Sequence, residues 1–389
     1  MLTMKSLLGI AAMLFASTPV YSANSTFHIP HSTFPLWSTV SNAMLDERWA
    51  PAYCLLADGR HALIAGGFSY TRQVCVDSAD IYDERRHKFV HAHGRLHVPR
   101  DFANANLLPN GSVLVSGGYN TEHGSLDTAE LYVPKRNRFE LLPSKMSNRR
   151  ELFTATTLRD GRVLCAAGLD LHHRGTVDTA DVYDPRTARF TPLTSHLGQD
   201  RFGHNAVLLA DGRVLIAGGK SWQVGHPDKP LVSAEIFDPS TETFHRVGDL
   251  SVPRDRPTLT LLPDGKVLVA GGQNGPEGPL TCEVFDPKAE TFSTLPNGLK
   301  TARMAHNATM LPGGQVLIAG GWCPPARSTT STVEVFDPST GAFVDAPSVP
   351  VDIHDFATVL FPDGLLLIAG GKQVDKEEKS LDGGWTLAP

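Results

Sequence analysis

The chain has 389 residues, and at roughly 150 residues per domain this length suggests two or three domains unless the sequence repeats. Hydrophobic residues make up 41% and aromatic residues 8%, which is enough for a packed core and excludes a mainly disordered chain. The net charge of −6 argues against a nucleic-acid binder that relies on a globally basic surface. With 35 glycines and 28 prolines, the composition favours many short strands joined by turns, and so an all-β protein.

The N-terminal segment has the pattern of a secretory signal peptide. An apolar run of about nine residues follows Lys5, and small residues allow cleavage near Ser22 or Ala23. This run is half of the roughly 20 residues that cross a bilayer, so a retained transmembrane anchor is the weaker interpretation. We therefore predict that residues 1–23 are removed. Residues 24–389 are then expected to form a secreted or periplasmic protein, monomeric and without a membrane span.

The chain has an odd number of cysteines: Cys54, Cys75, Cys165, Cys282 and Cys323. Export permits disulfides, but an odd count leaves at least one thiol outside any intrachain bridge. Their spacing matches no zinc motif, and buried small hydrophobes are the simpler interpretation. If a bridge forms within the chain, we expect it between Cys54 and Cys75.

One pattern recurs along nearly the whole chain. Its centre is a turn dipeptide that repeats every 49 to 53 residues, which indicates a repeat architecture. The seven dipeptides are Asp58-Gly59, Asn110-Gly111, Asp160-Gly161, Asp211-Gly212, Asp264-Gly265, Gly313-Gly314 and Asp363-Gly364.

Each copy predicts four strands. In the fourth copy, residues 205–210 precede the dipeptide and residues 213–219 follow it and end in Gly-Gly, as expected of two buried strands around a tight hairpin. The third strand has an acid–apolar–aromatic triplet, here Glu235 to Phe237, and the fourth opens on an aromatic residue, here Phe244.

The two ends of the chain complement each other. Trp37 stands where the aromatic residue of a fourth strand belongs, with no earlier strands before it. The seventh copy has its first two strands, and Trp385 falls where the aromatic residue of its third strand belongs. We expect one N-terminal strand to pair with three C-terminal strands, which closes the ring and removes the sheet edges.

At this point the sequence resembles the kelch β-propeller family, whose repeat has the same Gly-Gly, the same later aromatic pair and a similar entry to the first strand. The resemblance spans about residues 34 to 389 and implies a single seven-bladed propeller of four-stranded blades. It says less about function, because propellers include enzymes, ligand binders and interaction platforms. Galactose oxidase and an exported sialic acid epimerase are enzymes of this family, but no catalytic motif of either aligns with this chain.

The family fold places the start of each first strand on the same face as the loop between the second and third strands. These loops differ in length and sequence, whereas the turn dipeptides on the other face are nearly identical, so we expect binding on the loop face around the central channel. An arginine precedes the first strand in six of the seven copies, and Ile353 takes its place in the seventh: Arg48, Arg100, Arg150, Arg201, Arg254 and Arg303.

These arginines have two interpretations. Converging on the channel mouth, they would bind carboxylates of a ligand. A role that repeats from blade to blade is more typical of packing. Acids close to the arginines in sequence offer structural ion pairs or loop anchors: Glu47, Asp101, Glu151, Asp200 and Asp255. By the same argument the recurring acids of the third strands are expected to be structural. The loop tryptophans Trp222 and Trp322 are further candidates, since an indole can stack on a sugar.

Two histidines, His204 and His306, stand three residues after the arginine of their copies, and a proton-transfer role competes there with a structural one. Other loop histidines, His123, His172, His173 and His226, raise the question of copper or zinc, but they lack a fixed ligand spacing. No metal and no cofactor are therefore expected.

The sequence favours a binding protein for a small anionic carbohydrate or a protein partner, without nucleic acid, using the six arginines and both loop tryptophans. Whether it is an enzyme stays open. The alternative is a cofactor-free epimerase or lyase, with His204 or His306 as acid/base and Arg201 or Arg303 holding a substrate carboxylate. A copper oxidoreductase of the galactose oxidase type has less support: Tyr70 and Tyr119 with Cys75 or Cys323 are conceivable partners without a supporting motif.

Overall fold

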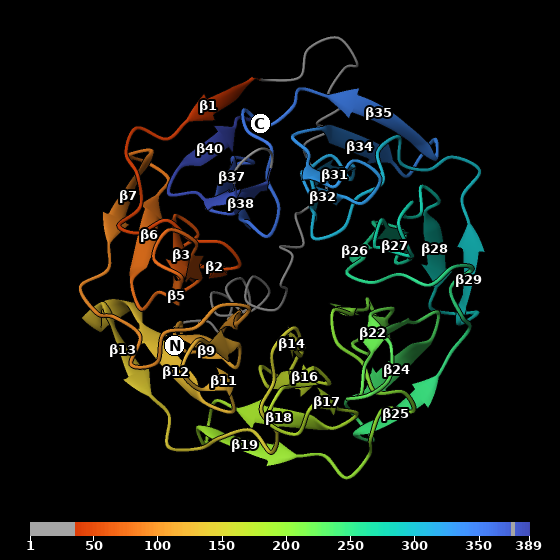
Figure 1. Cartoon of the computed structure of the whole chain (residues 1–389), viewed down its shortest axis with the longest axis horizontal. Helices are drawn as coiled ribbons and strands as arrows, with labels where there is room; N and C mark the ends of the chain where they lie inside the picture. Colours follow the sequence, from red (N-terminus) through yellow and green to blue (C-terminus); the bar gives the residue numbers. More distant parts are fainter. Residues whose placement is uncertain (1–35, 375–377) are drawn as a thin grey trace, which may run out of the picture.

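The computed structural model describes residues 36–374 and 378–389, and the predicted signal peptide lies outside them. Within this part the regular structure is β-strand except for one short 3-10 helix, η1 (Pro134–Arg136). None of the described helices is long and apolar enough to cross a membrane. Seven four-stranded antiparallel sheets stand around a common centre as the blades of a propeller (Figure 1). The predicted all-β, seven-bladed fold is confirmed.

Blades 1 to 7 are numbered in the order of their first strands. The first strands line the centre of the ring: β2 (Ala52–Leu55), β8 (Asn104–Leu107), β14 (Thr154–Thr157), β20 (Asn205–Leu208), β26 (Thr258–Leu261), β30 (Asn307–Met310) and β36 (Ala357–Leu360). The second strands follow: β3 (His61–Ala65), β9 (Val113–Ser116), β15 (Val163–Ala166), β21 (Val214–Ala217), β27 (Val267–Ala270), β31 (Val316–Ala319) and β37 (Leu366–Ala369).

The third and fourth strands complete each blade toward the outside. The third strands are β6 (Ala79–Asp83), β12 (Ala129–Val133), β18 (Ala180–Asp184), β24 (Ala234–Asp238), β28 (Glu283–Asp286), β34 (Val333–Asp337) and β40 (Gly384–Leu387). The outermost strands are β7 (Lys88–His91), β13 (Arg138–Leu141), β19 (Arg189–Pro192), β25 (Thr243–Arg246), β29 (Thr291–Thr294), β35 (Ala342–Ala346) and, in blade 7, β1 (Trp37–Thr39).

The ring closes through blade 7, as predicted. The N-terminal strand β1 pairs antiparallel with β40, and Trp37 faces Leu387 where the other blades pair two aromatic residues. One detail of the prediction is wrong. Trp385 lies opposite Ile368, in the row that holds the acid in the other blades, and Leu387 takes the aromatic place.

The hydrophobic core lies between neighbouring blades. In one cluster Ile64 and Tyr82 of blade 1 pack with Phe361 and Leu367 of blade 7, and the other clusters likewise combine two adjacent blades. Because both faces of a second strand are covered, it reads as a continuous apolar run instead of an alternating one.

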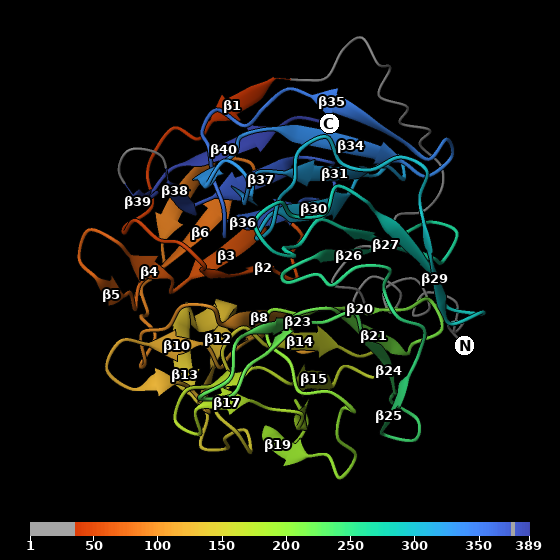
Figure 2. The same cartoon turned by 45° about the vertical axis from the view of Figure 1, so that its right-hand side comes forward.

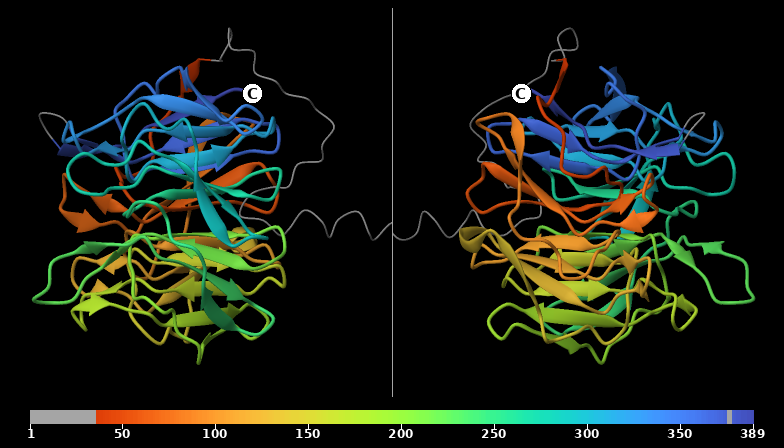
Figure 3. Two further views of the ribbon diagram at one scale, coloured as in Figure 1. Left: turned by 90° about the vertical axis from the view of Figure 1, so that its right-hand side faces the viewer. Right: turned by 60° about the vertical axis from the view of Figure 1, so that its left-hand side comes forward.

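Short hairpins extend six of the loops that join the second and third strands. They are β4 (Phe68–Ser69) with β5 (Val74–Cys75), β10 (Tyr119–Asn120) with β11 (Gly124–Ser125), β16 (Leu169–Asp170) with β17 (Gly175–Thr176), β22 (Lys220–Ser221) with β23 (Lys229–Pro230), β32 (Trp322–Cys323) with β33 (Ser328–Thr329), and β38 (Lys372–Val374) with β39 (Glu378–Ser380). Figures 2 and 3 show such hairpins, among them β4–β5 and β38–β39, projecting from one face of the disc.

The cysteines do not form bridges. All five are free, so the expected pair between Cys54, on β2, and Cys75, on β5, is wrong. Cys75, Cys165 and Cys282 are buried, as the simpler interpretation predicts. Burial raises the pKa of the Cys165 thiol to about 12, so this side chain stays neutral and packs as a small hydrophobe.

The Gly-Gly pair after each second strand joins neighbouring blades. Its last glycine donates a backbone hydrogen bond of 2.7 to 2.9 Å to the carbonyl oxygen of the residue that enters the next blade. The donors are Gly67, Gly118, Gly168, Gly219, Gly272, Gly321 and Gly371, and the last of them donates to Arg48 and so closes the circle. In blade 3 the first glycine of the pair is replaced by Ala167, which keeps the left-handed conformation at φ 55°.

The close approach at these glycines predicts a stability difference. At Gly118 the φ angle is +94°, and a Cβ atom would lie 2.3 Å from the carbonyl oxygen of Asp101. Gly118→Ala should therefore lower the free energy of unfolding by roughly 2–3 kcal/mol more than Gly341→Ala, because the control position shares a positive φ but is open. Urea unfolding of both variants measures the difference, and equal losses would contradict the role of the close approach.

Candidate functional site

The entries to the first strands and the loops after the second strands share one face, as expected. In every blade the residue after the arginine position forms a β-bridge with the residue after the glycine pair. We call this side the mouth face. The bridges are Trp49 to Phe68, Asp101 to Tyr119, Glu151 to Leu169, Phe202 to Lys220, Asp255 to Gln273, Met304 to Trp322 and His354 to Lys372.

All six candidate arginines have fully buried side chains. Each guanidinium bonds the acid of its own third strand at 2.7 to 3.2 Å. The expected ion pairs with acids close in sequence are therefore wrong, because the buried guanidinium groups point to the third strands instead of Glu47, Asp101, Glu151, Asp200 or Asp255. In blade 6, Arg303 also donates to the carbonyl oxygen of Gly320 at 2.8 Å and to both oxygens of Thr332. The pairs are Arg48–Asp80, Arg100–Glu130, Arg150–Asp181, Arg201–Glu235, Arg254–Glu283 and Arg303–Glu334.

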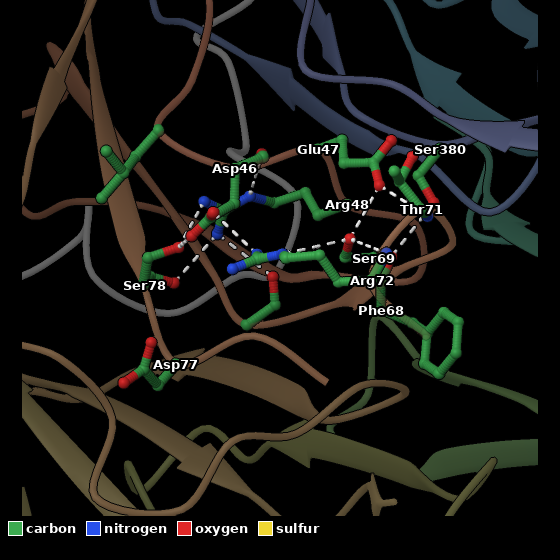
Figure 4. Close-up of polar contacts among 12 residues, drawn as sticks. Asp46, Glu47, Arg48, Phe68, Ser69, Thr71, Arg72, Asp77, Ser78 and Ser380 are labelled. Atoms are coloured by element: carbon green, nitrogen blue, oxygen red, sulfur yellow. Dashed lines mark hydrogen bonds and ion pairs between the residues drawn. The ribbon is translucent and has the colours of Figure 1, made fainter. Parts of the chain in front are cut away.

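Blade 1 adds a second layer to this network (Figure 4). Arg48 donates to the Ser78 hydroxyl at 2.9 Å, and Ser78 in turn donates to Asp46. Arg72, half exposed on the mouth face, pairs with Asp46 at 2.7 Å. Burial lowers the pKa of Arg48, while the carboxylate of Asp80 acts in the opposite direction. The guanidinium group is therefore enclosed by partners from its own blade.

Blade 7 shows what happens when the arginine is absent. Ile353 replaces it, Trp385 occupies the row of the acid, and both side chains belong to one hydrophobic cluster. Arginine and acid are thus lost together, which favours the structural ion pair over ligand contact. A recurring sequence signal went unused, namely a hydroxyl residue two places before each acid: Ser78, Thr128, Thr179, Ser233, Thr281 and Thr332. Ligand binding by these arginines stays a prediction, and their burial gives it no support.

The two candidate catalytic histidines are also buried. Nε2 of His204 lies 2.9 Å from the hydroxyl of Thr154 in blade 3, and Nε2 of His306 lies 3.0 Å from that of Thr258 in blade 5. Burial lowers the pKa of His204 well below its usual value and that of His306 to about 3, so both imidazoles are neutral at pH 7. This geometry favours packing between blades, and a catalytic role stays a prediction.

The structure separates the two candidate tryptophans. The backbone of Trp222 bonds Thr176, which ties the loops of blades 3 and 4 together. Trp322 lies near the imidazole of His354, with ring centroids 6.1 Å apart. It joins a group that we call the mouth cluster: Trp49, Tyr70, Phe102, Trp322, His354 and Lys372. Sequence reasoning missed its other members because the residue types at their positions differ from copy to copy.

The mouth cluster combines aromatic rings with a cation. The rings of Trp49 and Phe102 meet edge to face at 5.1 Å, and Trp49 is 6.2 Å from His354. The ammonium of Lys372 lies 5.2 Å from the centre of the Trp49 ring and 4.9 Å from that of Tyr70. Trp49, Tyr70, Phe102 and Lys372 are only half-buried. Such a set offers apolar ring surface next to a charge that can select an anion.

A charged pair borders the cluster. Arg256 of blade 5 bonds Asp355 of blade 7 at 3.1 Å and lies 5.2 Å over the ring of Phe102. Nδ1 of His354 is 3.0 Å from the same carboxylate. Burial alone would raise the pKa of Asp355, but Arg256 and His354 outweigh it and hold the pKa at about 2. Asp355 therefore stays ionised and fixes Arg256 and His354 in place.

The backbone around the mouth is held in an unusual conformation. The second residue after the arginine position has a positive φ of 47° to 62° in all seven blades. Five of these residues donate a backbone hydrogen bond to their counterpart in the preceding blade, as Phe102 does to Ala50 at 3.0 Å. Six of the seven are not glycine, so the ring holds a conformation that L-residues rarely adopt: Ala50, Phe102, Leu152, Gly203, Arg256, Ala305 and Asp355.

Two buried acids stand at the entries of blades 2 and 3 on the mouth face, and one of them directly precedes Phe102 in sequence. Burial raises the pKa of Glu151 to about 7, although Ser125 donates a hydrogen bond to it at 2.9 Å. Burial and the nearby charge of Glu151 raise the pKa of Asp101 well above its usual value. Oδ1 of Asp101 has no hydrogen-bond partner among the described residues. These acids therefore take up a proton more easily than an exposed pair of carboxylates would.

Comparison with known proteins supports the fold and leaves the chemistry open. A family model described as Kelch motif matches residues 305–350. A galactose oxidase of Gibberella zeae is 34% identical over 117 residues, which are 29% of this chain and 17% of that protein. An F-box/kelch-repeat protein of Arabidopsis thaliana is 36% identical over 76 residues, 19% of this chain and 20% of that protein. The chain thus spans no more than a fifth of the curated relatives it matches.

Among solved structures, a fungal alcohol oxidase of the AA5 family in complex with copper superposes with a TM-score of 0.70. The match covers 92% of this chain and 77% of that one at 18% identity, which shows a shared fold.

The described residues do not fit a copper site. Among the described residues, no group of three or more His, Cys, Asp or Glu side chains could hold a metal ion. The candidate Cys75 is free, and its sulfur contacts the backbone oxygen of Tyr119 at 3.5 Å. His173 is engaged by Asp170 at 2.7 Å.

The buried ion pairs predict a large effect on stability. Arg303→Met leaves Glu334 buried without its partner, and we expect the free energy of unfolding to fall by about 3–5 kcal/mol. The control Arg186→Met removes an arginine whose side chain is 77% exposed and should cost less than about 1 kcal/mol. Urea unfolding measures both losses. If Arg303→Met lost no more stability than Arg186→Met, Arg303 would again be a candidate for ligand contact.

Glu151 predicts a pH dependence. Its folded pKa of about 7 exceeds its usual 4.5, so between these values the folded state binds a proton that the unfolded state lacks. Stability conferred by this group is complete below pH 4.5 and falls by up to about 1.4 kcal/mol per unit as the pH rises toward 7.

Glu151→Gln should remove this slope and raise the melting temperature at pH 7.5. The exposed control Glu122→Gln should leave the slope unchanged. Thermal unfolding between pH 5 and 7.5 tests both, and an unaltered slope in Glu151→Gln would contradict the assignment.

Proposed function

We propose that this chain, which belongs to the kelch-repeat β-propellers, binds a carboxylated saccharide at the mouth cluster. The observation that carries the proposal is the departure from sevenfold repetition: Trp49, Trp322 and Lys372 come from three different blades and meet at one place. Residues at repeated positions hold the propeller together. An unrepeated group of half-buried rings is not needed for that purpose and is better explained by ligand binding.

The chemistry of the cluster suits a sugar. The apolar C–H face of a pyranose packs against an indole, and Trp49 and Trp322 are the indoles that flank His354. Lys372 lies beside Trp49, where it can meet a carboxylate on the stacked ring; its present partner, Glu378, is 2.7 Å away and 44% exposed. The six arginines, being buried, have no part in this model of recognition.

The relatives agree with a saccharide ligand without requiring it. Two of the curated proteins that match are galactose oxidases, and their match covers 17% of their length. The epimerase or lyase alternative has less support, because His204 and His306 are buried and neutral. Export to a bacterial periplasm or the medium, predicted from residues 1–23, is part of the proposal.

Titration calorimetry of the full-length protein with galacturonate and galactose tests the site. Trp322→Ala should weaken binding of both sugars about tenfold, since the stacking surface is lost. Lys372→Met should weaken galacturonate about fivefold and leave galactose unchanged, because only the acid has a charge to lose.

Trp222→Ala is the matched control, as it removes an indole from the same face between blades 3 and 4. It should leave both affinities unchanged. An effect of Trp222→Ala with none of Trp322→Ala would move the site to that side of the mouth. If the protein bound neither sugar, the proposal would be overturned and a protein partner favoured.

A further inference from the structure

The six turns between third and fourth strands occupy equivalent positions in blades 1 to 6. The turns in one half of the ring are nevertheless basic, and those in the other half are acidic. The turns of blades 1 to 3 contain eight Lys or Arg against three Asp or Glu, and those of blades 4 to 6 contain one against five. The turns are residues 83–88, 133–138, 184–189, 238–243, 286–291 and 337–342.

These turns lie away from the mouth face. In blade 1 the backbone amide of Glu84 donates to the carbonyl oxygen of Arg60, so the turn sits beside the hairpin of the first two strands. The outer strands that begin at the basic turns, β7, β13 and β19, follow one another along one side of the ring (Figure 1). The basic turns are therefore neighbours on the outer wall, on the opposite face from the mouth cluster.

In the other half of the ring, acids of the turns form ion pairs with arginines of neighbouring blades. Arg162 of blade 3 bonds Glu242 of blade 4 at 2.5 Å, and Arg213 of blade 4 bonds Glu290 of blade 5. Four cations of the basic turns, by contrast, have no ion pair or side-chain hydrogen bond within the described part of the chain, and all four are exposed. We call them the basic rim: Arg85, Lys88, Lys135 and Arg189.

A cleft of about 500 Å³ adjoins the rim at blade 1. Three arginines outnumber two acids in its lining, so it favours an anionic group. The lining residues are Asp58, Arg60, His61, Asp83, Arg85 and Arg86.

We propose that the basic rim binds a linear anionic polysaccharide, which runs from the cleft at blade 1 along the turns of blades 2 and 3. Unpaired cations recur in three consecutive blades, which suits a chain with repeating charges. The large exposed apolar side chains of the described residues all lie outside these turns, so the rim has nothing to insert into a lipid bilayer. The exposed positions of residues 83–88, 133–138 and 184–189 also have no Phe, Tyr or Trp to stack on nucleic-acid bases.

The test uses the full chain and fluorescent polygalacturonate in about 50 mM salt, where surface charge is weakly screened. All variants carry Trp322→Ala, so that the mouth cluster does not contribute. Neutralising the rim should raise the dissociation constant about tenfold, and salt should weaken binding less steeply than in the parent. The rim variant is Arg85→Gln with Lys88→Gln, Lys135→Gln and Arg189→Gln.

The matched control makes the same change in net charge on blades 4 and 5, and it should bind within twofold of the parent. It combines Arg246→Gln, Lys266→Gln, Lys288→Gln and Lys300→Gln. Equal losses in both variants would mean that net charge alone drives binding and would overturn the proposal. No binding by the parent would overturn it as well, as would rim-dependent binding of anionic vesicles or DNA in place of the polysaccharide.

Discussion

The propeller depends on the hydrogen bond between each blade and the next at the glycine pair. The bond recurs in all seven blades, including blade 7, where the buried arginine is absent. It needs a residue that tolerates positive φ and has almost no side chain. In blades 1 to 6 a Cβ atom on the donor would lie 2.3 to 3.2 Å from a carbonyl oxygen at the entry of the same blade, and on Gly371 it would meet the side chain of Ile353. The glycines thus set the distance between blades, and the hydrophobic clusters between blades fill the space that this distance leaves.

The buried arginines depend on the same geometry. Arg303 reaches the carbonyl oxygen that Gly320 presents and the acid of the third strand, and so fastens the entry of a blade to its two middle strands. A buried pair of this kind costs desolvation and gains little net free energy, yet removal of one partner is costly. Blade 7 replaces both with Ile353 and Trp385, so an apolar pair can take the place of the ion pair when both members change together.

Much of the fold could be predicted from the sequence because it repeats. Seven turn dipeptides at nearly constant spacing, together with Trp37 as a lone fourth strand, were enough to predict blade number and ring closure. The register of blade 7 could not be predicted, since Trp385 gave an aromatic signal two residues before the true position at Leu387. An aromatic residue in the row of the acid has no counterpart in the other six copies.

The sequence predicted the face of the propeller that carries the candidate site, but not the residues that form it. The arginines stood out because they repeat, and the same repetition marks them as structural. Trp49, Tyr70 and Lys372 could not be recognised, because their proximity depends on ring closure between blades 1 and 7 and each has a different place in its own copy. Closure brings together the two ends of the chain, whose sequences are the least constrained by the repeat, so blade 7 and its neighbour are where an unrepeated cluster can form without disturbing the pattern that holds the other blades. There one face of the ring combines an indole, a phenol and an ammonium from blades that lie far apart in the sequence.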